Sequence, residues 1–163
     1  MDILDLLLEV MDLELINFII EKNLSLSCAE SCTGGLLTAE FVKFSGASKF
    51  FYEGIIAYSN KAKIKRLGVN KNILKKFGAV SKEVAIEMLK NLETDICISS
   101  TGVAGPNKDD FNNKVGLVYI GLKIKDEIFV NEYNFSGSRS EIQIQAVNSA
   151  LDMLKNRLQE FDF

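Results

Sequence analysis

Hydrophobic and polar residues alternate along the chain with two different periods, which separate the expected helices from the expected strands. Segments 2–22 and 138–159 repeat apolar residues every three or four positions, as amphipathic helices do. Segment 24–29 joins small and apolar residues, and 50–58 is rich in aromatic and β-branched residues, so both are expected to be strands. Further helices are expected at 36–42, 60–67, 71–77 and 82–92, and further strands at 95–100, 115–124 and 127–135.

The order of these elements, α-β-α-β-α-α-α-β-β-β-α, predicts the class of fold. Helices and strands alternate at first, which favours a sheet covered by helices, and three strands then follow one another. Lys125 and Asp126 separate the last two strands and suit a hairpin. We therefore expect an α/β protein, a three-layer α/β/α sandwich whose mixed sheet contains an antiparallel portion. No linker or repeat interrupts the pattern, so residues 1–163 are expected to form a single domain.

Composition restricts the chemistry that such a fold could carry. The chain has 163 residues, a formal net charge of −3 and no histidine. The lack of histidine excludes Ser-His-Asp and Cys-His catalysis and histidine-ligated metals. The negative charge argues against a nucleic-acid partner or an anionic membrane surface. Acidic residues interrupt the apolar N-terminal segment, so neither a signal peptide nor a membrane span is expected.

The three cysteines point to structural thiols in the core. Cys28 and Cys32 are separated by three residues instead of two, and Cys97 stands alone. Three thiols without histidine make a poor zinc site, so no metal is expected. Reduced cysteines are typical of a cytoplasmic protein, which is the location that we expect.

Four polar segments fall where the expected strands end. The first, AESCTGG at 29–35, leads from a strand through a small polar turn into a helix. Such a turn exposes backbone N–H groups and the positive end of a helix dipole, which can hold a phosphate, a carboxylate or a developing oxyanion. Ser31 or Thr33 could equally cap the helix without any catalytic role.

The second segment, YSNKAK at 58–63, lies where a strand is expected to end and a helix to begin. Lys61 and Lys65 share one helix face, whereas Lys63 points to roughly the opposite side, towards apolar structure. A lysine that is partly removed from water has a lowered pKa and can act as a general base. The same pattern also arises in a basic surface helix whose lysines all reach the solvent.

The remaining two segments are SSTGVAGP at 99–106 and FSGSR at 135–139. In the first, a strand ends in hydroxyl groups and glycines, so the backbone could approach a ligand closely or simply turn. In the second, the guanidinium of Arg139 stands at a helix start, where it could grip a phosphate or carboxylate or lie exposed. Without histidine a serine needs another activator, and a neutral lysine assisted by a tyrosine hydroxyl is one chemical solution.

Together these segments resemble the CinA C-terminal domain family, also called the nicotinamide-nucleotide amidohydrolase (PncC) family, in its stand-alone form. AESCTGG and the YSNxxK pattern are the most specific matches, and the resemblance covers about residues 5 to 155. The other matching stretches, in the family's order, are LGV at 67–69, GAVS at 78–81, TGVAGP at 101–106, VG at 115–116 and FSGSR at 135–139.

The resemblance implies an amidohydrolase of pyridine nucleotide recycling that converts nicotinamide mononucleotide into nicotinate mononucleotide and ammonia. By position, Ser31 would be the nucleophile, Lys63 would be its base, and the Tyr58 hydroxyl would bond to the Ser–Lys pair. The reaction would need neither a metal nor an organic cofactor. Substrate-binding residues would be Thr33, Gly34, Asn60, Thr101, Gly102, Gly105 and Arg139.

The chain departs from the family pattern in two places. Segment 107–114 reads NKDDFNNK where the family often has a glycine-rich stretch and a Lys-Pro, and Gln143 stands where many members carry a second basic residue. Glu30 neighbours the expected nucleophile but, on a strand, would point to the opposite face, and it is expected to be structural.

Three interpretations remain open from the sequence. The first is the amidohydrolase, the second is a non-catalytic nucleotide-binding or adaptor module of the same fold, and the third is hydrolysis of a different small amide by the same serine. The expected partners are a small-molecule substrate and further copies of this chain. The apolar faces of the terminal helices favour a homodimer or a larger homo-oligomer.

Overall fold

The elements of the chain follow the predicted order closely. A computed structural model describes residues 13–163, so the first part of the helix expected over 2–22 lies outside the described residues and its remainder is α2 (Leu13–Glu21). The other elements are β1 (Leu26–Glu30), α3 (Leu36–Val42), a 3₁₀ turn η1 (Ala47–Lys49), β2 (Phe51–Ile56), α4 (Asn60–Leu67), α5 (Lys71–Phe77), α6 (Lys82–Glu87), β3 (Ile96–Gly102), β4 (Leu117–Ile124), β5 (Glu127–Asn134) and α7 (Arg139–Leu158).

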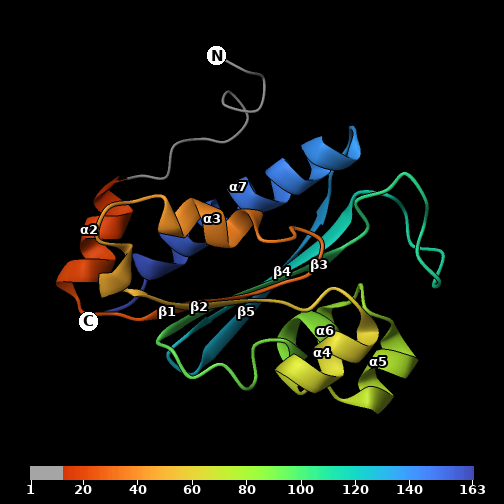
Figure 1. Cartoon of the computed structure of the whole chain (residues 1–163), viewed down its shortest axis with the longest axis horizontal. Coiled ribbons are helices and arrows are strands. Elements are labelled where there is room, and N and C mark those ends of the chain that lie inside the picture. Colours follow the sequence, from red (N-terminus) through yellow and green to blue (C-terminus); the bar gives the residue numbers. More distant parts are fainter. Residues whose placement is uncertain (1–12) are drawn as a thin grey trace.

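The strands form one mixed sheet in the order β2-β1-β3-β4-β5. Strand β1 runs parallel to β2 and β3, whereas β4 runs antiparallel to both β3 and β5. Figure 1 shows α2, α3 and α7 on one face of the sheet and α4, α5 and α6 on the other. The expected three-layer α/β sandwich with an antiparallel portion is therefore confirmed.

Each face of the sheet has its own apolar core. On the side of α2, α3 and α7, the core includes Ile19, Phe41 and Ile98. On the side of α4, α5 and α6, it includes Leu67 and Met88. The central strand β3 is buried on nearly its whole length, because helices cover both of its faces.

Polar caps fix where the helices begin on the second face. The side chain of Ser59 accepts a hydrogen bond from the N–H of Ala62, which starts α4 directly after β2. Ser81 caps α6 in the same way, by accepting a hydrogen bond from the N–H of Val84. Helix α6 is shorter than expected, because beyond Met88 the backbone bonds change to the tighter i−3 spacing, with Leu89 bonding back to Ile86.

Glu30 joins the end of β1 to the start of α3. Its carboxylate is fully buried and accepts hydrogen bonds from the Thr33 hydroxyl at 2.6 Å and from the backbone N–H groups of Leu37 at 3.0 Å and Thr38 at 2.9 Å. These N–H groups belong to the first turn of a helix, where no carbonyl of the helix can reach them. Glu30 is thus structural, as expected, and it holds the turn that carries Ser31.

The loop between β3 and β4 is closed at its base by Gly116. The N–H of Gly116 donates to the carbonyl of Val103, and the N–H of Phe135 donates to the carbonyl of Gly116. Gly116 has φ +96°, and a Cβ at this position would lie 1.9 Å from the Phe135 carbonyl oxygen. Only glycine allows this close crossing of two backbone segments.

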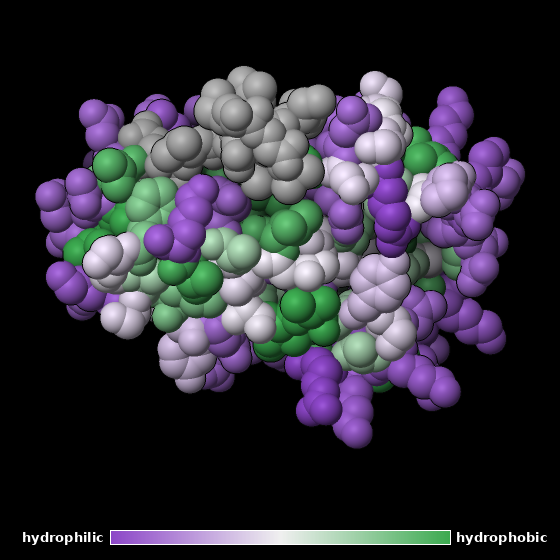
Figure 2. Space-filling model, turned by 45° about the horizontal axis from the view of Figure 1, so that its top comes forward, coloured by the Kyte–Doolittle hydropathy of each residue, from purple (hydrophilic) through white to green (hydrophobic). Residues whose placement is uncertain are grey.

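Part of the surface is apolar. Figure 2 shows hydrophobic side chains gathered near the middle of one face and hydrophilic side chains around its outline. The exposed large apolar residues include Val42 on α3 and Tyr52 and Ile56 on the edge strand β2. The homo-oligomer that the sequence suggested stays a prediction. No helix within residues 13–163 has the length and apolar character needed to span a membrane.

Replacing Glu30 by glutamine is expected to destabilise the fold by about 3 kcal/mol, because an amide NH₂ would face N–H donors and leave buried groups without an acceptor. Urea unfolding followed by circular dichroism measures this loss. Glu93→Gln, at an exposed position, is the matched control and should change stability by less than about 0.5 kcal/mol. Equal stability of the two variants would contradict the capping role.

Candidate active site

A serine and a lysine from distant parts of the sequence meet at the ends of the parallel strands. Ser31 follows β1 directly, and its N–H donates to the carbonyl of Ser100 on β3 at 3.0 Å, so its backbone continues the sheet. Lys63 lies one turn into α4 and is 1% exposed. The Lys63 Nζ donates to the Ser31 Oγ at 2.8 Å and to the backbone carbonyl of Tyr58 at 2.7 Å.

The environment of Lys63 favours the neutral amine. Burial lowers the pKa of Lys63 to about 8, and the nearby Cys32 thiol offsets this only in part. Among residues 13–163, no carboxylate lies within ion-pair distance of this amine. At pH 7.5 roughly a quarter of the molecules would then carry an uncharged lysine, compared with a negligible fraction for a lysine in water.

The contacts of a neutral amine suit proton transfer from Ser31. One N–H of Lys63 can remain on the Tyr58 carbonyl, which leaves the nitrogen lone pair free to accept the proton of the Ser31 hydroxyl. The distance of 2.8 Å lies within the range required for a general base and its nucleophile. The arrangement can therefore generate an alkoxide without histidine.

Tyr58 contacts the pair differently from the expectation. Its backbone carbonyl bonds to Lys63, but its hydroxyl accepts a hydrogen bond from Arg139 Nη2 at 2.9 Å, and the residue is 59% exposed. The sequence predicted a hydrogen bond from the Tyr58 hydroxyl to the Ser–Lys pair, and this prediction was wrong. The reason is that Tyr58 lies after β2 at the rim of the site, where its side chain points away from the Ser–Lys pair and contacts Arg139 at the start of α7.

The Ser31–Lys63 pair opens into a cleft of about 500 Å³, a size typical of small-molecule sites. Six of the residues named from the sequence line it, namely Ser31, Tyr58, Asn60, Lys63, Thr101 and Gly102. The hydroxyl of Thr101 is already used, since it donates to the Ala79 carbonyl at 2.7 Å. Thr101 therefore shapes the cleft by its position and has no free hydroxyl proton to offer.

The other four named residues lie outside the lining of the cleft. Thr33 is buried, and its hydroxyl bonds to Glu30 and to the Ser100 hydroxyl at 2.7 Å. Gly34 forms the turn with φ +58°. The Gly105 carbonyl accepts a hydrogen bond from Arg139 Nη1, so these two residues hold each other beside the cleft. All four support the site from behind or at its rim.

Sequence reasoning missed five lining residues, which are Ala79, Val80, Asp109, Asp110 and Phe111. The first two lie in GAVS, which matched the family pattern, so a signal for them was present. Asp109 to Phe111 lie in the 107–114 segment that departs from the family pattern. That departure indicated a changed loop near the site, but it did not single out any of its residues. Gln143 was also missed as a contact: its Nε2 donates to the Cys32 carbonyl at 2.9 Å and steadies the turn after Ser31.

The cysteine beside Ser31 is not a competing nucleophile. Burial raises the pKa of Cys32 to about 12, so its reactive thiolate form is scarce at neutral pH. Cys28, Cys32 and Cys97 are all buried, and none forms a disulfide. Across residues 13–163 no cluster of three or more histidine, cysteine or carboxylate side chains is placed to hold a metal ion.

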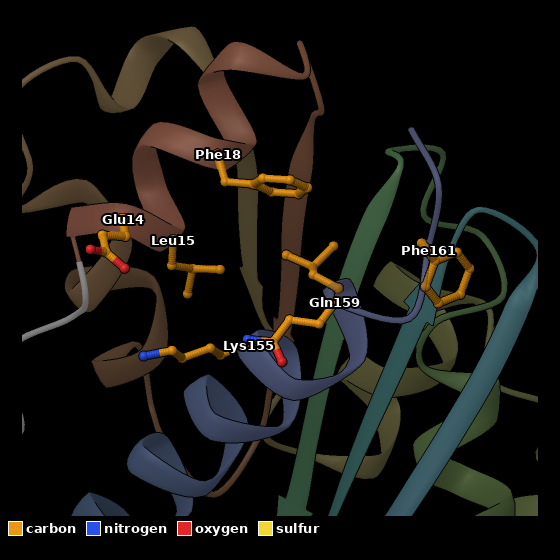
Figure 3. A pocket seen from close by; sticks show the side chains of 7 residues that line it. Glu14, Leu15, Phe18, Lys155, Gln159 and Phe161 are labelled. Carbon is orange, nitrogen blue, oxygen red and sulfur yellow. The ribbon is translucent and has the colours of Figure 1, made fainter.

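A second pocket lies between α2 and the C-terminal end of α7. It measures about 230 Å³ and is lined by Glu14, Leu15, Phe18, Lys155, Leu158, Gln159 and Phe161. Figure 3 shows the side chains of these residues around the space between the two helices and the C-terminal tail. It shares no residue with the cleft at Ser31 and contains no hydroxyl or thiol nucleophile, so the cleft is the candidate active site.

The fold and this site can be compared with known proteins. The family model named CinA C-terminal domain matches residues 9–158, and the chain belongs to this family. A relative from Clostridium botulinum (strain 657 / Type Ba4), which carries the name competence-damage inducible protein, is 48% identical over 147 residues. That match covers 88% of this chain but only 36% of the relative, so the chain spans about a third of the length of such curated relatives.

Solved structures agree with the family. The competence damage-inducible protein A (ComA) of Klebsiella pneumoniae has a TM-score of 0.88 and 28% identity, covering 91% of this chain and 95% of the other. The CinA superfamily protein ECK1530/EC0983 of Escherichia coli has a TM-score of 0.86 and 29% identity, covering 95% and 92%. The protein CihA of Agrobacterium tumefaciens has a TM-score of 0.80 and 34% identity, covering 88% and 93%. These likenesses cover nearly all of each chain.

Burial of Lys63 should also be visible in the pH dependence of stability. Because its pKa is lowered in the folded state, the unfolded chain binds more protons between about pH 8 and 10.5, and Lys63 disfavours folding most below pH 8. The stability of the wild type relative to Lys63→Met should therefore improve by about 2–3 kcal/mol as the pH rises from 7 to 10.5. Urea unfolding at several pH values measures this difference.

Lys61→Met is the control for that measurement, since Lys61 lies on the same helix but is exposed. Its stability relative to the wild type should stay nearly constant over the same pH range. If the Lys63→Met difference were equally constant, Lys63 would not be held with a lowered pKa.

Proposed function

We propose that this chain is an amidohydrolase that acts on nicotinamide mononucleotide, releasing ammonia and nicotinate mononucleotide by a Ser–Lys mechanism. The observation that carries the proposal is the 2.8 Å contact between a buried lysine amine and a serine hydroxyl in a cleft. The resemblance of AESCTGG and YSNxxK to the amidohydrolase family supports the choice of substrate. The competence-damage names of the relatives describe no reaction, so the activity rests on the site itself.

The first step forms an acyl-enzyme. Neutral Lys63 takes the proton of the Ser31 hydroxyl while the Ser31 oxygen attacks the carboxamide carbon of the substrate. The carbon becomes tetrahedral and its former carbonyl oxygen becomes an anion. The proton on Lys63 is then in place for the departing group.

Backbone N–H groups after Ser31 are the candidates for stabilising this oxyanion. The N–H of Gly34 already donates to the Ser31 carbonyl, and the N–H of Gly35 donates to Glu30. The N–H groups of Cys32 and Thr33 donate to no oxygen within residues 13–163. These two N–H groups directly follow the nucleophile, and they are the oxyanion donors in our proposal.

The second half of the reaction restores the enzyme. The Lys63 ammonium gives its proton to the amide nitrogen, the C–N bond breaks, and ammonia leaves. A water molecule then loses a proton to Lys63 and attacks the ester carbon. Lys63 passes this proton to the Ser31 oxygen as the ester C–O bond breaks, and the carboxylic acid that forms loses its own proton to solvent water and leaves as the carboxylate. Each proton that Lys63 accepts is passed on within the same half-reaction.

Arg139 acts from the rim of the cleft. Two of its five N–H donors are used by the Tyr58 hydroxyl and the Gly105 carbonyl, which ties the end of β2 to the loop after β3. The remaining donors can take up an anion such as the phosphate of a nucleotide. Its role is therefore to hold the rim in position and to provide positive charge for the phosphate.

The purified protein is expected to release ammonia from nicotinamide mononucleotide, and both Ser31→Ala and Lys63→Met should lower kcat by about a thousandfold or more, since each removes one partner of the proton transfer. A coupled ammonia assay with product analysis by chromatography measures this. Lys61→Met keeps the same helix and should retain activity. Binding without turnover in the wild type would support the nucleotide-binding module instead.

The reaction should become faster as the pH rises, because the base works only when Lys63 is unprotonated. The value of kcat/KM is expected to rise about tenfold per pH unit below the pKa of Lys63, to bend near pH 8 and to level off above it. Initial rates between pH 6 and 10 provide the profile. A rate that falls over this interval would contradict a lysine base.

A further inference from the structure

An aromatic ring from the unusual loop faces the same cleft as the Ser–Lys pair. Phe111 lies between β3 and β4, is 50% exposed, and lines the cleft together with Ser31 and Lys63. Its ring packs over Gly78, where an added Cβ would come within 2.7 Å of the ring. The ring is therefore supported on one side by backbone while part of it remains open to the cleft and the solvent.

The loop that presents Phe111 is held together by Asp109. The Asp109 carboxylate accepts hydrogen bonds from the N–H of Phe111 at 3.2 Å and from the N–H and side-chain amide of Asn113, each at 2.8 Å. Its oxygens are thus engaged within the loop. Asp110 also lines the cleft, but it is exposed and has no hydrogen bond or ion pair to the part of the chain that the structure describes.

The chemistry of the proposed substrate determines which of its groups would face Phe111 and Asp110. In a nicotinamide nucleotide the carboxamide is bonded directly to the ring, so a carboxamide that reaches Ser31 brings its ring into the cleft with it. The ring nitrogen carries the sugar and a fixed positive charge. This cation enters beside Lys63, whose protonated form would repel it, so an opposing negative group or π-face favours binding.

We propose that Phe111 and Asp110 form the wall that recognises the positively charged pyridinium ring, with Phe111 offering its π-face and Asp110 its unpaired carboxylate. This inference rests on the proposed function and adds the determinant of specificity to it. The site should therefore bind a cationic ring more tightly than an uncharged ring of similar shape, because both groups attract the positive charge. The segment NKDDFNNK, which departs from the family pattern, is then a recognition element of this chain.

A pair of ligands that differ mainly in ring charge tests the proposal. Nicotinamide mononucleotide has a cationic ring, whereas its reduced 1,4-dihydro form has the same ribose, phosphate and carboxamide on an uncharged ring. Calorimetric titration of Ser31→Ala protein with each ligand gives the two Kd values without turnover. The oxidised form should bind about tenfold more tightly than the reduced form.

Variants of the wall should reduce this preference selectively. In the Ser31→Ala background, Phe111→Leu and Asp110→Asn are each expected to lower the ratio of the two Kd values about three- to fivefold. The effect of Asp110→Asn should shrink at high salt because the carboxylate is exposed. Asp126→Asn, in the hairpin between β4 and β5, removes a similar charge away from the cleft and should leave the ratio unchanged. Circular dichroism verifies that each variant is folded.

The outcomes separate this inference from the proposed activity. If the wild type does not hydrolyse nicotinamide mononucleotide but the ring preference and its loss in both variants are seen, the activity fails and ring recognition stands. If the wild type hydrolyses it but the ratio is near one, or neither variant changes the ratio, ring recognition is overturned and the activity stands. Failure of both ligands to bind also overturns ring recognition.

Discussion

A lysine that is buried beside a serine, with no carboxylate within ion-pair distance in residues 13–163, is the constraint on which the rest of this site depends. Removing a cation from water is costly, and a protein can limit that cost by pairing the cation or by releasing its proton. Among residues 13–163, the Lys63 amine donates hydrogen bonds only to neutral oxygens, the Ser31 hydroxyl and the Tyr58 carbonyl, so release of its proton is favoured. The same burial that opposes folding at neutral pH is what makes the amine a base, which links stability and chemistry in one residue.

Most other polar groups around the pair are used to hold it in place. Glu30 and Thr33 fix the turn after β1 from behind, and Gln143 steadies it from α7 through the Cys32 carbonyl. Arg139 ties the rim together through Tyr58 and the loop after β3. With these groups engaged in such contacts, the reacting hydroxyl and amine remain the pair that is free to exchange a proton. Such preorganisation by surrounding contacts is what a site of this kind requires.

The sequence predicted the layers, the mixed sheet and the bounds of α3, α4 and α5. Local signals define α4 and α5, since Ser59 and Asn70 cap their starts and a glycine follows the end of each helix. The helical period also placed Lys63 on a different helix face from Lys61, directed towards the protein interior, and the structure brings Lys63 to Ser31 as expected. Two features could not be read in this way. The direction of the Tyr58 hydroxyl depends on the start of α7, which is 81 residues away in the chain. The position of Phe111 depends on how the 107–114 loop folds back over Gly78, a contact that no local pattern encodes.

The protonation state of Lys63 is the central claim, and a direct titration of this amine is its most direct test. Protein labelled with ¹³C at the lysine Cε positions reports each amine by NMR as the pH is raised. One lysine resonance is expected to titrate with a pKa near 8, and it should be missing in Lys63→Met protein. If every lysine, including the one assigned to position 63, titrated near the ordinary value of about 10.4, the amine would be charged at neutral pH and the account would be wrong.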